Sequence, residues 1–195
     1  MSPRIRQISD TEVLAAAATV IATLGQRATL ADVAAAAGIA PPTLIQRYGS
    51  KRGLLMILAR QGFGGAAEAL AAARAIHASR VEALISALCQ RACGMLPDPA
   101  VMCMQLIGLQ GGASDPDFRE IAEKQVHEWE QEIGNLLDEA VLWGELRSCD
   151  TKALARLVQA VYSGSLCAWA VVRRGTPAES VREQLETLLE SYLTS

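Results

Sequence analysis

The sequence lacks features that would assign it to several other classes of protein. Gly, Pro or charged residues interrupt every apolar run before the roughly twenty apolar residues that a membrane-spanning helix needs. No apolar segment follows the polar start of the chain, so we expect no signal peptide and no membrane partner. The five cysteines form an odd number without a CxxC pair, which argues against a disulfide framework. We therefore expect a cytoplasmic protein.

Motifs of common catalytic and cofactor-binding sites are also missing. We find no nucleophile elbow and no phosphate-binding glycine loop, and the segment HEWEQ, which begins at His127, lacks the second histidine of a zincin motif. Cys89 and Cys93 lie four residues apart, with His77 and Cys103 nearby in sequence. We interpret the cysteine pair as core packing, with a metal or redox site as the alternative. We predict no enzymatic activity, no metal and no cofactor.

Charge is distributed unevenly along the chain. Residues 1–60 carry seven basic and three acidic side chains, a net charge of +4, whereas residues 61–195 carry eleven basic and eighteen acidic ones, a net charge of −7. A basic head on an acidic body is typical of a protein that binds a polyanion through its N-terminal third. Chance scatter of surface charge is the alternative, so the charge has to be weighed together with a motif.

The residue pattern predicts an all-α protein. Ala, Leu, Glu, Gln and Arg dominate, and the alternation of β-branched and polar residues that marks a strand is absent. With 51% hydrophobic residues, the chain can bury a core. Glycines, prolines and capping residues divide it into about nine helices. The first five span 10–24, 30–37, 41 or 42 to 48, a helix that Ser50 caps and that has a kink at glycines 62, 64 and 65, and 80–94. The last four span 100–109, 116–143 with a bend near Gly134, 151–173, and a helix that opens with the capping box Thr176-Pro177-Ala178-Glu179.

A short stretch near the N-terminus carries the strongest functional motif. Thr29 is placed to cap a helix, with Asp32 three residues later to close a capping box, and this helix ends at Gly38. Gly38 adopts the left-handed conformation at little cost, so the chain can reverse there and begin a second short helix. Two short helices with a glycine-containing turn over residues 30–49 predict a helix-turn-helix.

The second helix of this motif has two different faces. Leu44 and Tyr48 belong to an apolar stripe that we expect to pack on the first helix of the chain. The opposite face carries side chains that suit DNA, because Arg reads guanine, Gln reads adenine, and Thr and Lys bind phosphates. These residues are Thr43, Gln46, Arg47 and, at the start of the next helix, Lys51.

The segment TLADVAAAAGIAPPTLIQRYGSKRGLL resembles the DNA-binding segment of the TetR family of transcriptional regulators. The spacing matches from end to end at Thr29, Val33-Ala34, Ala37-Gly38-Ile39, Thr43-Leu44, Tyr48, Ser50-Lys51 and Leu54-Leu55. The segment LWGELRSCDTKALARLVQAVYSGSLCAWA also resembles family members, in which Gly-Glu-Leu-Arg precedes a dimerisation helix. The resemblance therefore extends along the whole chain, and it is most specific in the first 55 residues.

This resemblance implies a fold and a function. Residues 1–55 are expected to form a three-helix helix-turn-helix DNA-binding domain, and residues 56–195 a helical bundle for ligand binding and dimerisation. The expected function is a ligand-responsive repressor that binds a pseudo-palindromic operator as a homodimer and responds to a small apolar effector. The alternative is an all-α ligand-binding or interaction protein that keeps the fold without sequence-specific DNA binding. The expected DNA-binding residues are Thr29, Pro41, Pro42, Thr43, Gln46, Arg47 and Lys51.

The match has two departures in the second helix of the motif. Ile45 stands where family members usually have a phosphate-contacting Tyr, and Ala40 stands where they have a capping Ser. Absence of the cap costs about 1 kcal/mol of helix stability. Pro42 disfavours the α conformation of the residue before it, so we expect Pro41 to cap a helix that begins at Pro42. We also expect the two prolines to contact thymine methyl groups.

The body offers two further groups of candidate residues. The resemblance implies an apolar effector pocket, and the large apolar residues Met95, Met102, Met104, Phe118, Trp129 and Trp143 are its candidate lining. The last two helices carry apolar residues on more than one face, which the resemblance explains by a four-helix dimer interface. The candidates for that interface are Leu154, Leu157, Val158, Val161, Leu185, Leu188 and Leu189. For both groups, burial in the core of one protomer is the alternative.

Overall fold

The computed structural model describes residues 8–63, 65–94 and 115–194, and these residues form nine α-helices with one short 3₁₀ turn. Their strand content is limited to one isolated bridge between Leu146 and Leu193. The predicted all-α fold is therefore confirmed. The helices are α1 (Asp10–Leu24), α2 (Leu30–Ala37), α3 (Pro41–Tyr48), α4 (Lys51–Phe63), α5 (Ala66–Ile76), α6 (Arg80–Gly94), α8 (Pro116–Leu142), α9 (Thr151–Val172) and α10 (Pro177–Glu190).

The chain divides into two compact units, Met1–Phe63 and Gly64–Ser195. The first unit includes the whole of α4, so it extends beyond residue 55, the end of the DNA-binding domain expected from the sequence. The predicted interruption after α4 is present, because α4 ends at Phe63, α5 begins at Ala66, and Gly65 adopts a left-handed φ of +88°. The predicted helix 100–109 lies outside the described residues.

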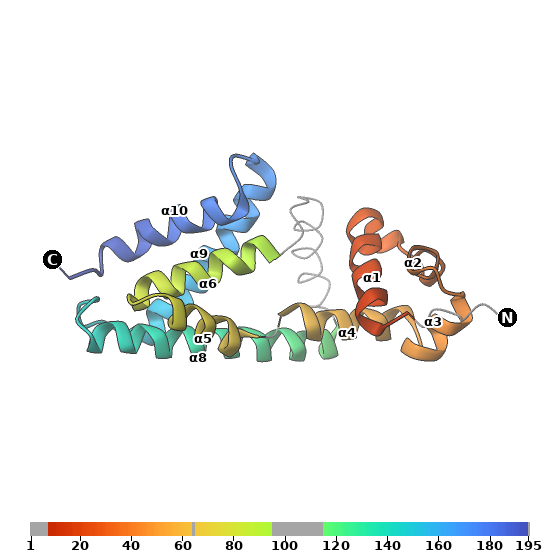
Figure 1. Ribbon diagram of the computed structural model, residues 1–195, viewed down its shortest axis with the longest axis horizontal. Helices are drawn as coiled ribbons and strands as arrows, with labels where there is room; N and C mark the ends of the chain where they lie inside the picture. Colours follow the sequence, from red (N-terminus) through yellow and green to blue (C-terminus); the bar gives the residue numbers. More distant parts are fainter. Residues whose placement is uncertain (1–7, 64, 95–114, 195) are drawn as a thin grey trace. The chain divides into compact units, whose positions relative to one another are not determined.

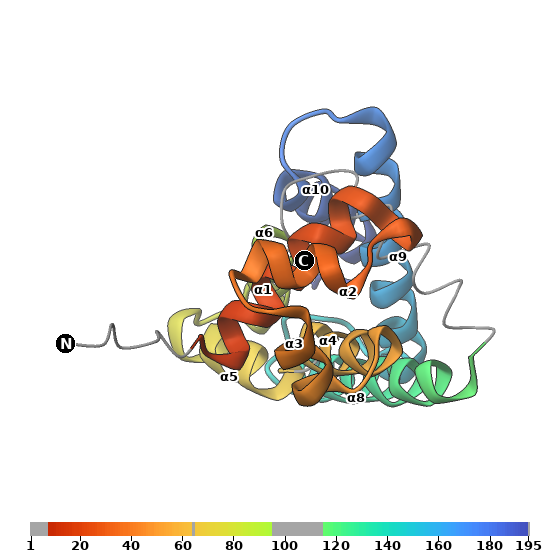
Figure 2. The same cartoon turned by 90° about the vertical axis from the view of Figure 1, so that its right-hand side faces the viewer.

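Local chemistry explains the helix boundaries of the first unit. Thr29 and Asp32 form the predicted capping box at the start of α2, where the Asp32 backbone amide donates to the Thr29 hydroxyl at 3.2 Å. Gly38 ends α2 in the left-handed conformation (φ 68°, ψ 30°), as predicted. The Ile39 amide then donates to the Ala34 carbonyl at 3.0 Å, which closes the turn into α3 (Figure 2).

The start of α3 corrects one expectation. Both prolines lie inside the helix, at its first two positions, and Ala40 is the capping residue, with extended backbone and no capping side chain. The Ala40 carbonyl accepts the amide of Thr43 at 2.9 Å. Prolines fit the first turn of a helix because their φ is already helical and their missing N–H would have no helical partner there. This gain outweighs the steric bias of Pro42 against a helical Pro41.

The core of the first unit lies where α1, α2, α3 and α4 meet. Leu44 is fully buried and Tyr48 is 8% exposed, so the inner face of α3 is the one predicted. Small side chains let the helices approach closely, and Ala34 is fully buried. The rest of this core consists of Val13, Leu14, Ala17, Val33 and Leu54.

The second unit is a bundle in which α6 packs against α5, α8 and α10, while α9 packs against α8 and α10 (Figure 1). The long helix α8 contains Gly134 at a buried position, and a Cβ there would lie in ordinary contact with the Cβ of Ala155 on α9. The predicted capping box Thr176–Glu179, with Pro177 at the first helical position, opens α10 as expected. Helix α9 ends at Val172, because Arg173 adopts a left-handed φ of 54° before Gly175 is reached.

Among the described residues, α9 is long and apolar enough to cross a membrane by length and composition alone, with a mean hydropathy of 1.2. The glycine and charged residues within this segment therefore do not prevent α9 from meeting the length and composition criterion for a membrane-spanning helix. A core helix meets the same criterion, and α9 contributes Leu154, Val158, Tyr162, Leu166 and Trp169 to the core of its unit.

Candidate nucleic-acid interface

The outer face of α3 is mainly apolar. Pro41, Pro42, Ile45 and Gln46 are exposed and follow the spacing of one helical face, and half of the Ile45 side chain is accessible. Thr43 is partly buried beside this face. The face therefore presents a single long hydrogen-bonding side chain, Gln46, among three apolar ones.

Arg47 is directed toward the start of α1. Its Nη1 donates to the backbone carbonyl of Ile8 at 2.8 Å and lies 3.6 Å from Oδ1 of Asp10. Its side chain is only 27% exposed. Arg47 thus holds α3 against α1, and part of its charge is compensated by Asp10, whereas the sequence pattern predicts a DNA contact for Arg47.

The beginning of α4 completes the interface. Ser50 caps α4 as predicted, because its hydroxyl accepts the Gly53 amide at 3.0 Å. Lys51 is the first residue of α4 and is partly exposed. An ammonium beside the positive end of a helix dipole is suited to a phosphate. The Thr29 hydroxyl, by contrast, donates to Asp32 at 2.7 Å and serves the cap of α2.

The structure brings together only part of the predicted effector pocket. Met95, Met102 and Met104 lie outside the described residues. Trp129 is 4% exposed and Phe118 is partly buried, and their spacing of three helical turns places them on one face of α8. Trp143 follows the end of α8, is 59% exposed, and lies 25 positions after Phe118, or about 37 Å along a helix. One small pocket cannot contain both Phe118 and Trp143.

A hollow of about 650 Å³ lies elsewhere in the second unit. Its floor is apolar, with Val81, Ile85 and Leu189, and its rim carries Glu82 and Glu145. Of the predicted pocket residues that the structure describes, Phe118, Trp129 and Trp143 do not line it. Arg182 neutralises Glu82 through contacts at 2.8 and 3.2 Å, and Glu145 caps α6. The carboxylates of Glu82 and Glu145 are therefore already paired with groups of the same protomer.

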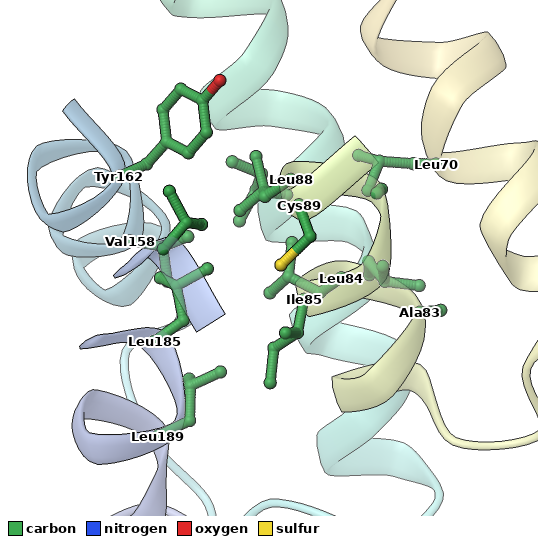
Figure 3. Packing of buried hydrophobic residues seen from close by; sticks show 14 of the residues in the cluster. Leu70, Ala83, Leu84, Ile85, Leu88, Cys89, Val158, Tyr162, Leu185 and Leu189 are labelled. Carbon is green, nitrogen blue, oxygen red and sulfur yellow. The ribbon is translucent and has the colours of Figure 1, made fainter. Parts of the chain in front are cut away.

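Most candidate interface residues lie in the core of their own protomer. Figure 3 shows Val158 of α9 and Leu185 of α10 pointing toward Leu88 and Cys89 of α6. Leu154, Val158, Leu185 and Leu189 are at most 2% exposed, and Leu188 is partly buried against the same core. Apolar periodicity identified these faces as buried, but their partners are helices of the same chain. Among the candidates, Leu157 is 41% exposed and Val161 is partly exposed.

The cysteine pair is split between core and surface. Cys89 is 9% exposed, its Sγ lies 3.4 Å from the Ala178 carbonyl, and burial raises the pKa of its thiol. Cys93 is exposed, and Cys103 lies outside the described residues. Within residues 8–63, 65–94 and 115–194, no group of three potential ligands is arranged to hold a metal ion. Core packing, as expected, describes Cys89.

The helix-turn-helix unit matches a known family. Residues 13–56 match the model described as bacterial regulatory proteins, tetR family. This unit is a tetR-family DNA-binding domain. The match covers α2, α3 and the start of α4, the elements that carry the exposed face of α3 and Lys51. No curated protein matches the sequence.

Solved structures of transcriptional regulators share the fold over nearly the whole chain. A putative regulator from Saccharomonospora viridis in complex with choline is 21% identical, with a TM-score of 0.80 over 95% of this chain and 97% of that one. The regulator FadR from Bacillus subtilis in complex with stearoyl-CoA is 17% identical, with a TM-score of 0.79 over 92% and 97%. SmeT, the repressor of a multidrug efflux pump of Stenotrophomonas maltophilia, is 19% identical, with a TM-score of 0.76 over 97% and 92%.

Two residues that shape the fold of this chain have roles that were not predicted from the sequence. A Cβ on Gly53 would collide with the backbone carbonyl oxygen of Tyr48, so this helical glycine allows α3 and α4 to meet closely. Glu145 accepts the Ser79 hydroxyl at 2.6 Å and the amides of Arg80 and Val81 at 2.7 and 3.1 Å. It therefore caps α6 from 65 positions away. The glycine in the first turn of α4 could have been recognised in the sequence as unusual for a helix. The contact of Glu145 with α6 has no corresponding sequence signal.

Proposed function

We propose that this protein is a transcriptional repressor that binds a pseudo-palindromic DNA operator as a homodimer and releases it when a small effector binds the second unit. The observation that carries the proposal is the exposed outer face of α3 within a tetR-family domain. Helix α3 enters the major groove, Gln46 contacts a base, and Lys51 at the start of α4 binds a phosphate. The effector signal reaches α3 through α4, the last helix of the first unit.

The test is binding to DNA from upstream of its own coding sequence and to sites selected from a random library. We expect a two-fold symmetric site, and an affinity that falls steeply as the salt concentration rises. Lys51→Ala lowers the slope of log affinity against log salt by about one for each phosphate that the variant no longer neutralises. Absence of any binding above the non-specific level at low salt contradicts the proposal.

The composition of the outer face supports a preference for thymine. Pro41, Pro42 and Ile45 have no hydrogen-bonding side chain, and the C5-methyl group of thymine is the apolar feature of the major groove. Gln46 suits adenine, because its side-chain amide can both donate a hydrogen bond to this base and accept one from it. We therefore expect a selected half-site with thymines opposite the apolar residues and an adenine opposite Gln46.

Replacement of single thymines by deoxyuridine isolates the methyl contact, because it removes one methyl group and leaves base pairing intact. Burial of a methyl-sized group is worth about 0.8 kcal/mol, so each contacted methyl changes affinity about fourfold. The Ile45→Ala variant should bind two operators with equal affinity when they differ only by deoxyuridine or thymine at the position that Ile45 contacts. Uracil substitution without effect at every thymine of the half-site contradicts this base preference.

The dimer contact is assigned to the exposed stripe of α9. Leu157, Ala160, Gly164, Ala168 and Val171 are exposed and recur at helical spacing on one face. Small residues allow a second helix to approach closely, and Leu157 is the large side chain at one end of the stripe. A second copy of the chain is the partner that a two-fold symmetric operator requires.

The effector is not determined by the fold. The regulator from Saccharomonospora viridis is in complex with choline, a cation, and FadR from Bacillus subtilis is in complex with stearoyl-CoA, which is anionic. Because the same fold accommodates both, the chemistry of the effector has to be inferred from the side chains of the second unit.

A further inference from the structure

A positive charge lies among three helices of the second unit. Arg91, in the last turn of α6, places its guanidinium carbon 4.1 Å from the ring centre of Trp129 on α8 and 5.7 Å from that of Tyr162 on α9. Both rings are buried, at 4% and 8% exposure. The site therefore joins one cation to two aromatic walls inside a single unit.

Helix α6 carries a second arginine–tryptophan stack, which shows what is different about Arg91. Arg80, the first residue of α6, lies 4.0 Å from the ring centre of Trp143, and its Nε donates to Glu139 at 2.8 Å. The stack at this end is therefore neutralised by a carboxylate. Arg91 has no carboxylate within ion-pair distance among residues 8–63, 65–94 and 115–194.

The surroundings of Arg91 do not compensate its charge. Burial lowers the pKa of Arg91, and the opposing influence comes from the phenol of Tyr162, which is neutral at physiological pH. Burial likewise raises the pKa of Tyr162 to about 12, so this phenol supplies no negative charge. An ion removed from water without a counter-ion is costly to the folded protein. An anion bound at Arg91 removes that cost.

The face of α8 next to Arg91 suits a ligand with an apolar body. Gln125, one turn before Trp129, is a buried polar side chain at 8% exposure, and Phe118 lies two turns earlier on the same face. Aromatic and apolar walls with a few polar groups are typical of small-molecule sites. Farther along α8, the buried residues Ile133, Leu136, Leu137 and Ala140 are aliphatic.

We propose that Arg91 binds the anionic group of an amphiphilic effector, with the apolar body of that effector against Trp129 and Tyr162. The guanidinium matches the two oxygens of a carboxylate, and it also binds phosphate oxygens. A cationic effector is disfavoured at this site, because the guanidinium of Arg91 stacks on the Trp129 ring and would repel a second positive charge there. The regulatory consequence rests on the proposed function, whereas anion binding itself does not.

Thermal unfolding of the full chain with matched ligands tests the inference. The probes are octanoate and 2-naphthoate, each compared with its neutral amide, together with octylamine and octanoyl-CoA. We expect the acids to raise the Tm by about 5 °C at a hundredfold excess over Kd, while the amides and the amine leave it unchanged. A response to octanoyl-CoA without a response to either free acid assigns the anion to phosphate rather than carboxylate.

Two arginine variants separate anion binding from removal of an aromatic stack. Arg91→Met weakens acid binding about tenfold to a hundredfold, the loss expected for a hydrogen bond to a charged group. Arg80→Met removes the other arginine–tryptophan stack, so it lowers the Tm but keeps the increment that the acids cause. The inference is overturned if neither the acids nor octanoyl-CoA shift the Tm, if the amides shift it equally, or if Arg91→Met keeps the full response.

Operator binding in the presence of the same probes separates this inference from the proposed function. An acid that binds through Arg91 without changing DNA affinity supports the anion site and contradicts ligand-responsive repression. If the chain binds DNA sequence-specifically but binds none of the anions, the DNA-binding part of the proposed function is supported and the anion site at Arg91 is contradicted.

Discussion

Tyr48, the last residue of α3, donates its hydroxyl to Oδ1 of Asp10, the first residue of α1, at 2.7 Å. Burial, together with this hydrogen bond to a carboxylate, raises the pKa of Tyr48 to about 12, so the phenol keeps its proton. The contact joins two helix ends 38 positions apart and determines where the outer face of α3 points. The orientation of α3 therefore depends on α1.

Tyr48→Phe is expected to loosen α3 without unfolding the second unit. Removal of the hydrogen bond costs about 1.5 to 3 kcal/mol, the range for a bond to a charged group. Hydrogen exchange read by mass spectrometry should show faster exchange in α1 and α3 and unchanged exchange in α6 and α8. In a double-mutant cycle, Asp10→Asn and Tyr48→Phe should be non-additive, and additive effects would show that the contact contributes nothing.

Arg47→Ala and Lys51→Ala are expected to weaken operator binding for different reasons. Arg47 donates a hydrogen bond to the Ile8 carbonyl and forms an ion pair with Asp10. Its removal therefore disturbs α1 and lowers operator affinity without lowering the slope of log affinity against log salt. Lys51→Ala lowers the slope by about one, because the variant neutralises one phosphate fewer. Affinity measured from low to moderate salt distinguishes the two, and a slope that falls by one in Arg47→Ala would return Arg47 to the phosphate-binding residues.

Gly53→Ala is expected to abolish operator binding. The added methyl group meets the Tyr48 carbonyl oxygen, so α3 and α4 must separate, and overpacking of this kind costs about 1 to 3 kcal/mol. Hydrogen exchange should increase in α3 and α4, and DNA affinity should fall. The control for hydrogen exchange is Gly164→Ala, since a Cβ at this exposed helical position meets nothing within 4 Å. Because Gly164 lies on the proposed dimer stripe of α9, operator affinity is compared instead with that of Ala15→Ser, at an exposed position of α1.

Glu145→Gln is expected to lower the stability of the second unit at neutral pH and to flatten its dependence on acid. Burial acts to raise the pKa of Glu145, but hydrogen bonds from Ser79 and from the amides of Arg80 and Val81 outweigh it, so the pKa is lowered. A lowered folded-state pKa means that ionised Glu145 stabilises the protein above the unfolded pKa of about 4.3. This contribution is lost as the pH falls through the folded-state pKa.

The measurement is urea unfolding followed by tryptophan fluorescence between pH 7 and pH 3. All three tryptophans lie in residues 64–195, so the signal reports the second unit alone. We expect a loss of about 1 to 3 kcal/mol at pH 7 that shrinks as the pH falls, because both proteins are then uncharged at residue 145. A loss that stays constant down to pH 3 would contradict the role of the charge. Glu190→Gln, at an exposed position, is the control.

Leu157→Glu is expected to dissociate the homodimer and to leave the protomer folded. Leu157 is 41% exposed on the apolar stripe of α9, so a carboxylate there is solvated in the monomer and buried in the dimer. Light scattering after size exclusion should give the mass of one chain, and operator affinity should fall. Leu142→Glu, at an 81% exposed leucine of α8, should remain dimeric. Leu185→Glu should unfold the second unit, because Leu185 is fully buried.

The sequence by itself determined what depends on neighbouring residues. The capping boxes at Thr29 and Thr176, the left-handed turn at Gly38 and the inner face of α3 follow from contacts within about four positions, so local pattern was sufficient to predict them. The exposed positions of Gln46 and Ile45 follow from the same periodicity. Fold class and the location of the helix-turn-helix were readable for this reason.

Only the tertiary structure decided which faces meet. Periodicity shows that a face is apolar, not whether its partner is another helix of the chain or a second copy, and so Val158 and Leu185 were assigned to an interface although they lie in the core. Arg47 turned toward Ile8, Glu145 capping α6 and Arg91 stacked on Trp129 all depend on residues dozens of positions away. Packing brings such residues together through the burial of whole faces, which no local spacing encodes.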